Sequence, residues 1–237
     1  MERLFCQLSS LRPKCVQSSI SRRNWTPKIK GNNMHLDRIS QALALSIQAH
    51  DGQTRKGTTI PYISHPMAVA SIALEYGADE DQTIAALLHD AVEDGGPHYA
   101  DRIKELFGER VVNIVLGCTD GVPDTTGKKE AWRPRKERYI AHLKEATDDV
   151  LLVSGADKLH NARAIASDLQ SVGLAVFERF TATMSQTLWY YETLADVFID
   201  RDTPIAQALK DTVQHMKQLV RQLEMERQSV ACHALKM

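Results

Sequence analysis

The stretch Leu87-Leu88-His89-Asp90-Ala91-Val92-Glu93-Asp94 sets an adjacent His-Asp pair inside an apolar run and follows it with an acidic pair. On a helix, residues four apart share one face, so we expect Glu93 above His89 and Asp94 above Asp90. The other side chains of the stretch are apolar, as in a buried helix. Burying several carboxylates beside one imidazole costs free energy unless a cation compensates their charge. The stretch therefore predicts a metal site on a buried helix.

Two further stretches contain residues that can complete such a site. Residues 61–66 (Pro-Tyr-Ile-Ser-His-Pro) place His65 directly before Pro66, and a proline at the first helical position would hold His65 extended at the mouth of the next helix. Residues 154–163 place Asp157 in a second, largely apolar helix, with Asn161 one turn later. Imidazole and carboxylate ligands with open coordination positions suit Mn²⁺ or Fe²⁺, with Zn²⁺ also possible. The predicted ligands of the divalent ion are His65, His89, Asp90 and Asp157.

The rest of the chain predicts further helices and almost no strand. Apolar residues recur at helical spacing, whereas alternation with period two is nearly absent. We therefore expect an all-α fold, a single helical bundle over residues 34–228 with a short tail at 229–237. The expected helices span 35–50, 66–76, 79–94, 98–107, 109–119, 136–146, 148–168, 174–182, 184–199 and 204–228.

Residues 121–136 form the longest stretch without helical periodicity and contain five cations: Lys128, Lys129, Arg133, Arg135 and Lys136. This cluster is either an ordinary solvated loop or a cationic rim that helps to capture a polyanion.

Composition narrows the class of protein. The chain has 237 residues, 43% of them hydrophobic, and a formal net charge of −1, which argues against a nucleic-acid binder. Four scattered cysteines indicate neither a disulfide framework nor a thiolate metal site. No apolar run reaches the length that crosses a membrane. We expect a cytoplasmic protein that takes a small-molecule substrate, with a homo-oligomer left open.

The first 33 residues differ from the remainder. They are rich in serine and carry seven basic residues against one acidic residue, without sustained periodicity. Such a segment suits a transit peptide or a basic tail, but we favour a disordered extension ahead of Met34.

Taken together, these motifs resemble a known family. His65, His89-Asp90 and Asp157 match the H…HD…D signature of the HD-domain metal-dependent phosphohydrolases. The flanking residues are similar to the hydrolase domain of the RelA/SpoT alarmone enzymes, in particular to the stand-alone small alarmone hydrolases. The resemblance covers roughly residues 35–200 and rests on these further segments: Arg55-Lys56, residues 61–66, 89–94 and 156–161, Glu178-Arg179-Phe180 and Leu188-Trp189-Tyr190-Tyr191.

This resemblance implies an activity and a set of roles. The implied reaction is hydrolysis of the 3′-pyrophosphate of the guanosine alarmones (p)ppGpp, releasing pyrophosphate and GDP or GTP, with one divalent ion, expected to be Mn²⁺. Glu93 and Asp94 would act on the attacking water as the catalytic pair. The implied substrate-binding residues are Arg55, Lys56, Asn161 and Tyr190.

Two departures from the family pattern leave the substrate open. Ala164 stands where the long bifunctional enzymes often have a threonine, and Gly57-Thr58-Thr59-Ile60 lengthens the segment after Arg55-Lys56. An adenosine alarmone hydrolase or an NADPH 2′-phosphatase therefore remains an alternative. A module that senses a nucleotide without turning it over is a further alternative, of another class.

Overall fold

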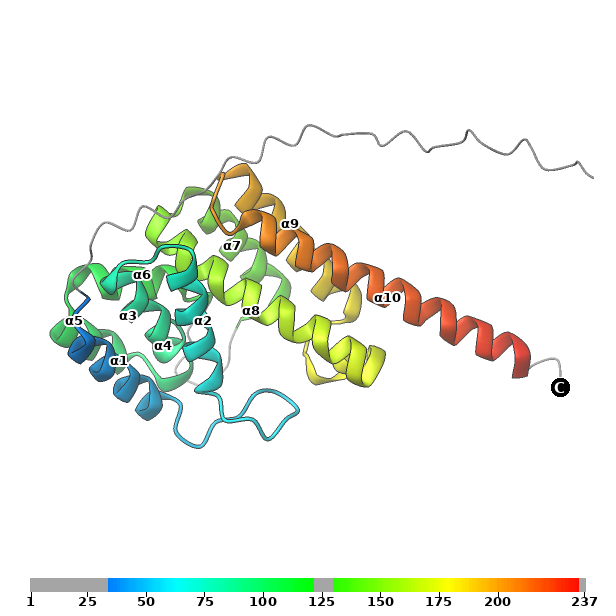
Figure 1. Cartoon of the computed structure of the whole chain (residues 1–237), viewed down its shortest axis with the longest axis horizontal. Coiled ribbons are helices and arrows are strands. Elements are labelled where there is room, and N and C mark those ends of the chain that lie inside the picture. The colour runs from blue at the N-terminus through cyan, green and yellow to red at the C-terminus, as the bar shows by residue number, and fades with distance from the viewer. Residues whose placement is uncertain (1–33, 122–129, 235–237) are drawn as a thin grey trace, which may run out of the picture.

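The computed structural model describes residues 34–121 and 130–234 (Figure 1). The predicted extension 1–33, the cations Lys128 and Lys129, and residues 235–237 of the predicted tail lie outside the described residues. The helices are α1 (Leu36–Ala49), α2 (Ser64–Glu75), α3 (Glu80–Leu88), α4 (Ala91–Gly95), α5 (His98–Phe107), α6 (Glu109–Cys118), α7 (Trp132–Glu145), α8 (Asp148–Val172), the 3₁₀ helix η1 (Gly173–Arg179), α9 (Met184–Asp200) and α10 (Ala206–Ala234).

The predicted all-α fold is confirmed. Over residues 34–121 and 130–234 the chain forms no β-strand, only an isolated antiparallel bridge between Thr54 and Pro61. The predicted start of the His-Asp helix is also correct, because Asp79 and Gln82 form a reciprocal capping box at the beginning of α3. Within the described segments, none of the helices combines the length and the hydropathy needed to cross a bilayer.

Helix α8 organises the bundle. It packs against α2, α3 and α6 on one side and against α9, α10 and η1 on the other, and Figure 1 shows it running through the middle of the molecule. Its buried residues include apolar side chains such as Leu151 and Leu159 but also Ser154, Asp157 and Lys158. Polar side chains on a central helix need partners from other elements, so α8 is where a buried polar site can form.

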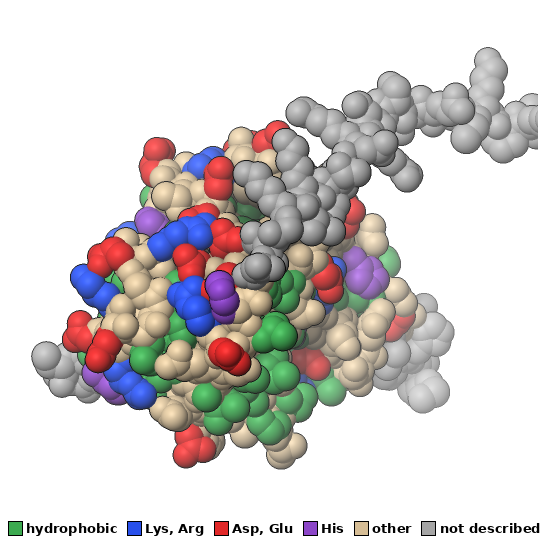
Figure 2. Space-filling view, turned by 60° about the vertical axis from the view of Figure 1, so that its left-hand side comes forward, with side chains coloured by type: hydrophobic (Ala, Val, Ile, Leu, Met, Phe, Trp, Pro, Cys, Tyr) green, Lys and Arg blue, Asp and Glu red, His purple; other side chains and the backbone are tan. Residues whose placement is uncertain are grey.

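The surface of the bundle mixes both signs of charge. Figure 2 shows Lys and Arg side chains interspersed with Asp and Glu over one face, beside a cluster of hydrophobic side chains. Large hydrophobic side chains are also exposed on the two N-terminal helices, for example Ile47 on α1 and Met67 on α2. An interspersed surface of this kind suits the net charge of −1.

The continuous helix predicted through the His-Asp pair is wrong. The chain forms α3 up to Leu88 and resumes as α4 at Ala91, with His89 and Asp90 between them. The backbone of Asp90 (φ −98°, ψ −4°) departs from regular helical values, and Asp90 serves as the N-cap of α4. His89 faces Asp90 and Asp157, whereas Glu93 accepts a hydrogen bond from the backbone of Asp120.

The extended conformation predicted for His65 is also wrong. Helix α2 begins at Ser64, so His65 is its second residue and Pro66 its third. The backbone N–H of His65 donates to the Tyr62 carbonyl at 2.8 Å, which closes the first helical turn before the proline. A proline is tolerated there because amides of the first turn have no intrahelical acceptor.

Several further helix boundaries also differ from prediction. Helix α8 ends at Val172 instead of residue 168, and α10 continues to Ala234, so residues 229–234 of the predicted tail are helical. Helix α7 begins at Trp132 instead of about residue 136, so Arg133 and Arg135 are helical and not part of a loop. The helix predicted over 174–182 is the shorter 3₁₀ helix η1, which the structure ends at Arg179. Gly173 terminates α8 with a positive φ of 65°, a conformation that glycine adopts without a steric penalty.

Candidate metal centre and adjoining cavity

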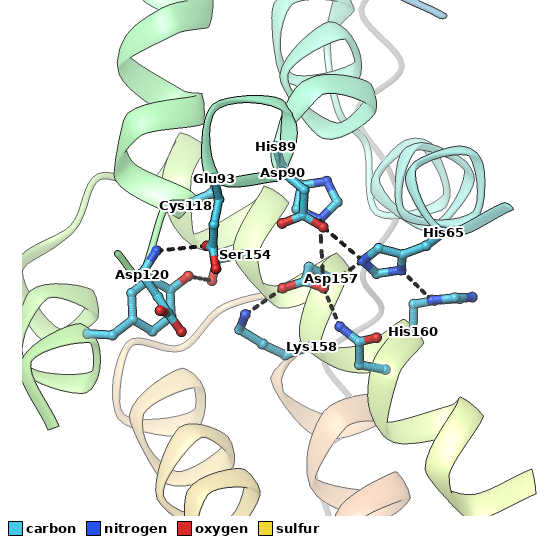
Figure 3. Close-up of polar contacts among 12 residues, drawn as sticks. His65, His89, Asp90, Glu93, Cys118, Asp120, Ser154, Asp157, Lys158 and His160 are labelled. Carbon is cyan, nitrogen blue, oxygen red and sulfur yellow. Dashed lines mark hydrogen bonds and ion pairs between the residues drawn. The ribbon is translucent and has the colours of Figure 1, made fainter. Parts of the chain in front are cut away.

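The four predicted ligands converge on one buried point from three parts of the chain (Figure 3). His65 comes from α2, His89 and Asp90 from the break between α3 and α4, and Asp157 from α8. His65 Nε2 lies 3.1 Å from Asp157 Oδ1 and 3.5 Å from Asp90 Oδ2. His89 Nε2 lies 3.0 Å from Asp90 Oδ2 and 3.8 Å from Asp157 Oδ1. Ligand atoms of His65, His89 and Asp157 all lie within 4.8 Å of one another, as a shared ion requires.

The hydrogen bonding of His89 leaves its inner nitrogen available to a metal. His89 Nδ1 lies 2.8 Å from the carbonyl oxygen of Ala86, which can only accept, so Nδ1 carries the proton. In the neutral ring, Nε2 then bears a lone pair that points at the two carboxylates. This nitrogen is buried and has no hydrogen-bond partner among the described residues. A buried unsatisfied nitrogen facing two carboxylates fits the ligand atom of a cation.

His65 is oriented in the same way by a second histidine. His65 Nδ1 lies 2.7 Å from His160 Nδ1. Burial, followed by the influence of His65 and Arg55, lowers the pKa of His160 to about 4, so that ring is neutral near pH 7. A neutral His160 that accepts at Nδ1 fixes the proton of His65 on its Nδ1 and frees Nε2 for the centre. His160, on α8, therefore supports the orientation of His65.

The charge of the centre also favours a cation. Burial by itself disfavours ionised carboxylates, but His89 and His65 hold the pKa of Asp90 well below its usual range. Burial likewise disfavours a charged Asp157, and Lys158 together with both histidines lowers its pKa. Burial would lower the pKa of His89, yet Asp90 and Asp157 raise it to about 9. The two carboxylates thus stay ionised and hold a proton on His89 when no other cation neutralises them.

Two residues that the sequence analysis missed fix the carboxylates. The Tyr62 hydroxyl donates to Asp90 Oδ2 at 2.7 Å, and Lys158 Nζ donates to Asp157 Oδ2 at 2.5 Å. Asn161 Nδ2 donates to the other oxygen of Asp157, Oδ1, also at 2.5 Å. Tyr62 lies in the motif that carries His65, three residues earlier. Its proximity along the chain was the only signal that pointed to it.

The predicted catalytic residues Glu93 and Asp94 differ in burial and in their hydrogen bonds. Glu93 is half-buried, and its Oε2 accepts from the backbone N–H of Asp120 at 3.4 Å. Asp94 is exposed, and its backbone carbonyl accepts from Gln53 Nε2 at 3.4 Å. Figure 3 shows Glu93 on the Asp120 side of the centre, away from His65. Of the two acids, Glu93 is the one that lines a partly enclosed space.

That space is a cavity of about 570 Å³, a volume typical of small-molecule sites. Glu93 lines it, whereas none of the four predicted ligands does. Its walls include Lys56 and Glu93, the α7 residues Trp132, Arg135 and Lys136, and Tyr190 of α9. Arg135 and Lys136 both form ion pairs with Asp120, whose carboxylate is almost fully buried. The cavity therefore has cations on its α7 wall and an acidic group, Glu93, three residues after the predicted ligand Asp90.

The four predicted substrate residues occupy two places. Arg55 Nη2 donates to Asn161 Oδ1 at 2.7 Å, which joins Arg55 through Asn161 to Asp157. Lys56 and Tyr190 line the cavity. The Tyr190 ring lies 4.8 Å from Lys136 Nζ, and its buried hydroxyl has no hydrogen-bond partner in the described part of the chain.

The described cations of residues 121–136 differ in position, and their capture of a polyanion stays a prediction. Arg135 and Lys136 line the cavity, whereas Arg133 stacks on Trp189 with its guanidinium carbon 3.3 Å from the ring centroid. Arg133 is absent from the cavity wall.

Comparisons with known proteins identify the family of this chain. The sequence model of the HD-domain family matches residues 42–183, a span that contains all four predicted ligands. The bifunctional (p)ppGpp synthase/hydrolase SpoT of Escherichia coli K12 is 37% identical over 133 residues, covering 56% of this chain. A guanosine-3′,5′-bis(diphosphate) 3′-pyrophosphohydrolase of Aquifex aeolicus is also 37% identical over 133 residues, covering 55% of this chain. The chain spans 18% of the length of each of these two relatives.

Two solved structures have a similar fold. A Listeria monocytogenes protein superposes with a TM-score of 0.55 at 25% identity, over 66% of this chain and 99% of that protein. A metazoan ortholog of SpoT, described as hydrolysing ppGpp and acting in starvation responses, superposes with a TM-score of 0.53 over 80% of this chain and 95% of its own. At 24% identity, this second similarity supports the fold alone.

Proposed function

Because the chain belongs to the HD-domain family, we propose that it is a metal-dependent phosphohydrolase that removes the 3′-pyrophosphate of guanosine alarmones. The observation that carries this proposal is the convergence of His65, His89, Asp90 and Asp157 beside a cavity with a cationic wall. The curated relatives named as (p)ppGpp hydrolases support the substrate class. The products would be pyrophosphate and GDP or GTP.

The proposed ion is one Mn²⁺ held by His65, His89, Asp90 and Asp157. Two imidazoles and two carboxylates suit Mn²⁺ or Fe²⁺ better than a closed zinc site, which favours thiolates. When bound, the ion would supply Lewis-acid stabilisation of the negative charge on the phosphoryl oxygens. Tyr62 and Lys158 would keep the carboxylates in place, and His160 would keep the proton of His65 on Nδ1.

Other residues of the chain would bind the substrate and accept the proton of the attacking water. Lys56, Arg135 and Lys136 would bind the phosphates of the substrate, because cations on a partly enclosed wall offset a polyanion. Glu93 would accept the proton of the attacking water, since it is half-buried at the cavity wall beside the centre. Arg55 and Tyr190 would position the nucleoside, through the planar guanidinium and the aromatic ring.

A nucleotide panel tests the proposal. The purified full chain, depleted of metal and then supplied with Mn²⁺, is incubated with ppGpp, pppGpp, ppApp and NADPH, and the products are separated by anion exchange. Pyrophosphate together with GDP or GTP is expected. Hydrolysis of ppApp alone would show that the enzyme is specific for adenosine alarmones. Release of orthophosphate from NADPH would show that it is a 2′-phosphatase. Binding without any turnover would make it a nucleotide sensor.

A further inference from the structure

The segment that carries Arg55 and Lys56 is an internally bonded loop, residues 53–62, here called the recognition loop. Its ends pair through the backbone, with Arg55 N–H donating to Ile60 O at 2.9 Å and Tyr62 N–H donating to Gln53 O at 3.0 Å. The N–H and hydroxyl of Thr58 both donate to the carbonyl of Arg55, at 3.0 and 2.9 Å. Because the loop is closed on itself, a contact at its tip affects the placement of the whole loop.

Two contacts attach the recognition loop to α8, one directly and one through Arg179 of η1. The first is the 2.7 Å hydrogen bond from Arg55 to Asn161. The second is made at the tip, where the side chain of Arg179 lies against Gly57. A Cβ atom on Gly57 would lie 2.6 Å from Arg179 Cδ, and Gly57 also has a positive φ of 68°. The tip is therefore shaped to accept the aliphatic stem of Arg179.

Arg179 is itself held by α8. Its Nη1 donates to Asp168 Oδ2 at 2.8 Å, and its side chain is only 21% exposed. Arg179 is the last residue of η1, the 3₁₀ helix that follows α8 and packs back against it. The contact thus runs from α8 through Asp168 and Arg179 to the tip of the recognition loop.

Both attachments lie on the face of α8 that holds the centre. Asp157, Asn161, Ile165 and Asp168 follow one another at spacings of four, four and three, which place them on one face of a helix. Asp157 is a predicted ligand, Asn161 holds Arg55, Ile165 lines the cavity, and Asp168 holds Arg179. One helix face therefore fixes the centre, the cavity and both anchors of the loop.

We propose that Arg179 is a positioning residue that clamps the recognition loop onto α8, so that Lys56 stays at the cavity wall and Arg55 stays on Asn161. The effect on catalysis rests on the proposed function, whereas the clamp itself does not. Since Arg179 touches the loop and not the centre, its loss should weaken substrate capture and leave the chemical step intact. The motif Glu178-Arg179-Phe180 gains a physical role in this way.

Hydrogen exchange of the free full-length protein tests the clamp without any substrate. In Arg179→Ala, the amides of residues 53–62 should exchange faster while those of α3 and α8 keep their protection. Arg179→Lys retains the stem and the charge and should restore most of the protection. Arg110→Ala is the matched control, because Arg110 also pairs with an α8 acid, Asp149, at the far end of that helix. Loop exchange equal to wild type in Arg179→Ala would overturn the proposal.

Kinetics on the substrate found with the nucleotide panel test the consequence. Arg179→Ala should raise KM about 3- to 10-fold, the cost of ordering a loop on binding, with kcat within about twofold and Mn²⁺ content unchanged. A fall in kcat at constant KM would overturn the positioning role. Absence of turnover by the wild type would contradict the proposed function instead, and the exchange experiment would still decide the clamp.

A double-mutant cycle separates the clamp from general destabilisation. Gly57→Ala should raise loop exchange and KM, because its Cβ meets Arg179 and its φ is positive. In an Arg179→Ala background the clash between the new Cβ and the Arg179 side chain is absent, so Gly57→Ala should have a smaller effect on loop exchange and KM. Strictly additive effects would overturn the contact. If Arg179→Ala lowers protection throughout the chain, Asp168→Asn is used as a milder variant. It should also make the amides of residues 53–62 exchange faster than in the wild type.

Discussion

The hydroxyl of Tyr62 donates a 2.7 Å hydrogen bond to Oδ2 of Asp90, the same oxygen that lies 3.0 Å from His89 Nε2. Burial, followed by the charges of Asp90 and Asp94, raises the pKa of Tyr62 far above its usual value, so the phenol remains a donor at any working pH. The hydrogen bond therefore sets the orientation of a predicted ligand from outside the ligand set.

Tyr62→Phe should weaken Mn²⁺ binding about 10- to 100-fold, the usual cost of removing a partner that orients a metal ligand. The affinity is measured by calorimetric titration of the metal-free protein. Tyr99→Phe, a buried tyrosine on α5, serves as the control and should bind Mn²⁺ as the wild type does. Unchanged affinity in Tyr62→Phe would show that the hydrogen bond does not orient a ligand.

Lys158→Met should destabilise the metal-free protein by about 3–5 kcal/mol, because it leaves the buried Asp157 carboxylate without its nearest cation. With Mn²⁺ present the loss should be smaller, since a cation at the centre offsets the same carboxylate. Urea denaturation with EDTA and with Mn²⁺ measures both values. Lys144→Met, an exposed lysine of α7, is the control, and an equal loss in the two conditions would separate Lys158 from the centre.

Glu93→Gln should lower kcat about 10²- to 10⁴-fold, the contribution of a general base, with Mn²⁺ content unchanged. Asp94→Asn makes the same chemical change at the exposed neighbour and should have a much smaller effect. Steady-state rates and metal analysis of both variants show which acid accepts the proton and whether either one holds the metal. The reverse order of effects would assign the proton to Asp94, and loss of the metal from Glu93→Gln would make Glu93 a ligand.

Asp120→Asn should destabilise the protein by about 3–5 kcal/mol near pH 7, because Arg135 and Lys136 would lose their shared, nearly buried partner. Burial opposes ionisation of Asp120, but Lys136 and Lys158 lower its pKa below the value of the unfolded chain. Its stabilising contribution is then complete above about pH 4 and is lost as the pH falls through the lowered pKa.

Stability measured by urea denaturation from pH 7 to pH 2.5 checks this dependence. The difference between wild type and Asp120→Asn should shrink below about pH 4, where the wild-type carboxyl also becomes neutral. Asp196→Asn is the control, since Asp196 is exposed and pairs with Lys210 only at 3.9 Å. A difference that stays constant with pH would contradict the lowered pKa.

The sequence by itself determined the all-α fold and the residues that could form a centre. Helical periodicity and the capping box at Asp79 are local properties, encoded within a few residues, and both appear in the structure. The sequence predicted a metal site from the residue types at His65, His89, Asp90 and Asp157, because buried carboxylates require a compensating cation. That these four side chains lie close together could be predicted only from the resemblance of the motifs to a known family.

The tertiary structure alone decided which side chains support that group. The hydrogen bond of Tyr62 to Asp90, the ion pairs of Arg135 and Lys136 with Asp120, and the contact of Arg179 with Gly57 join segments about 15 to about 120 residues apart. The break at His89-Asp90 also arose there, although the local pattern favoured a continuous helix. Such contacts depend on how helices pack, and packing is governed by the fit of whole surfaces, which no local sequence pattern records.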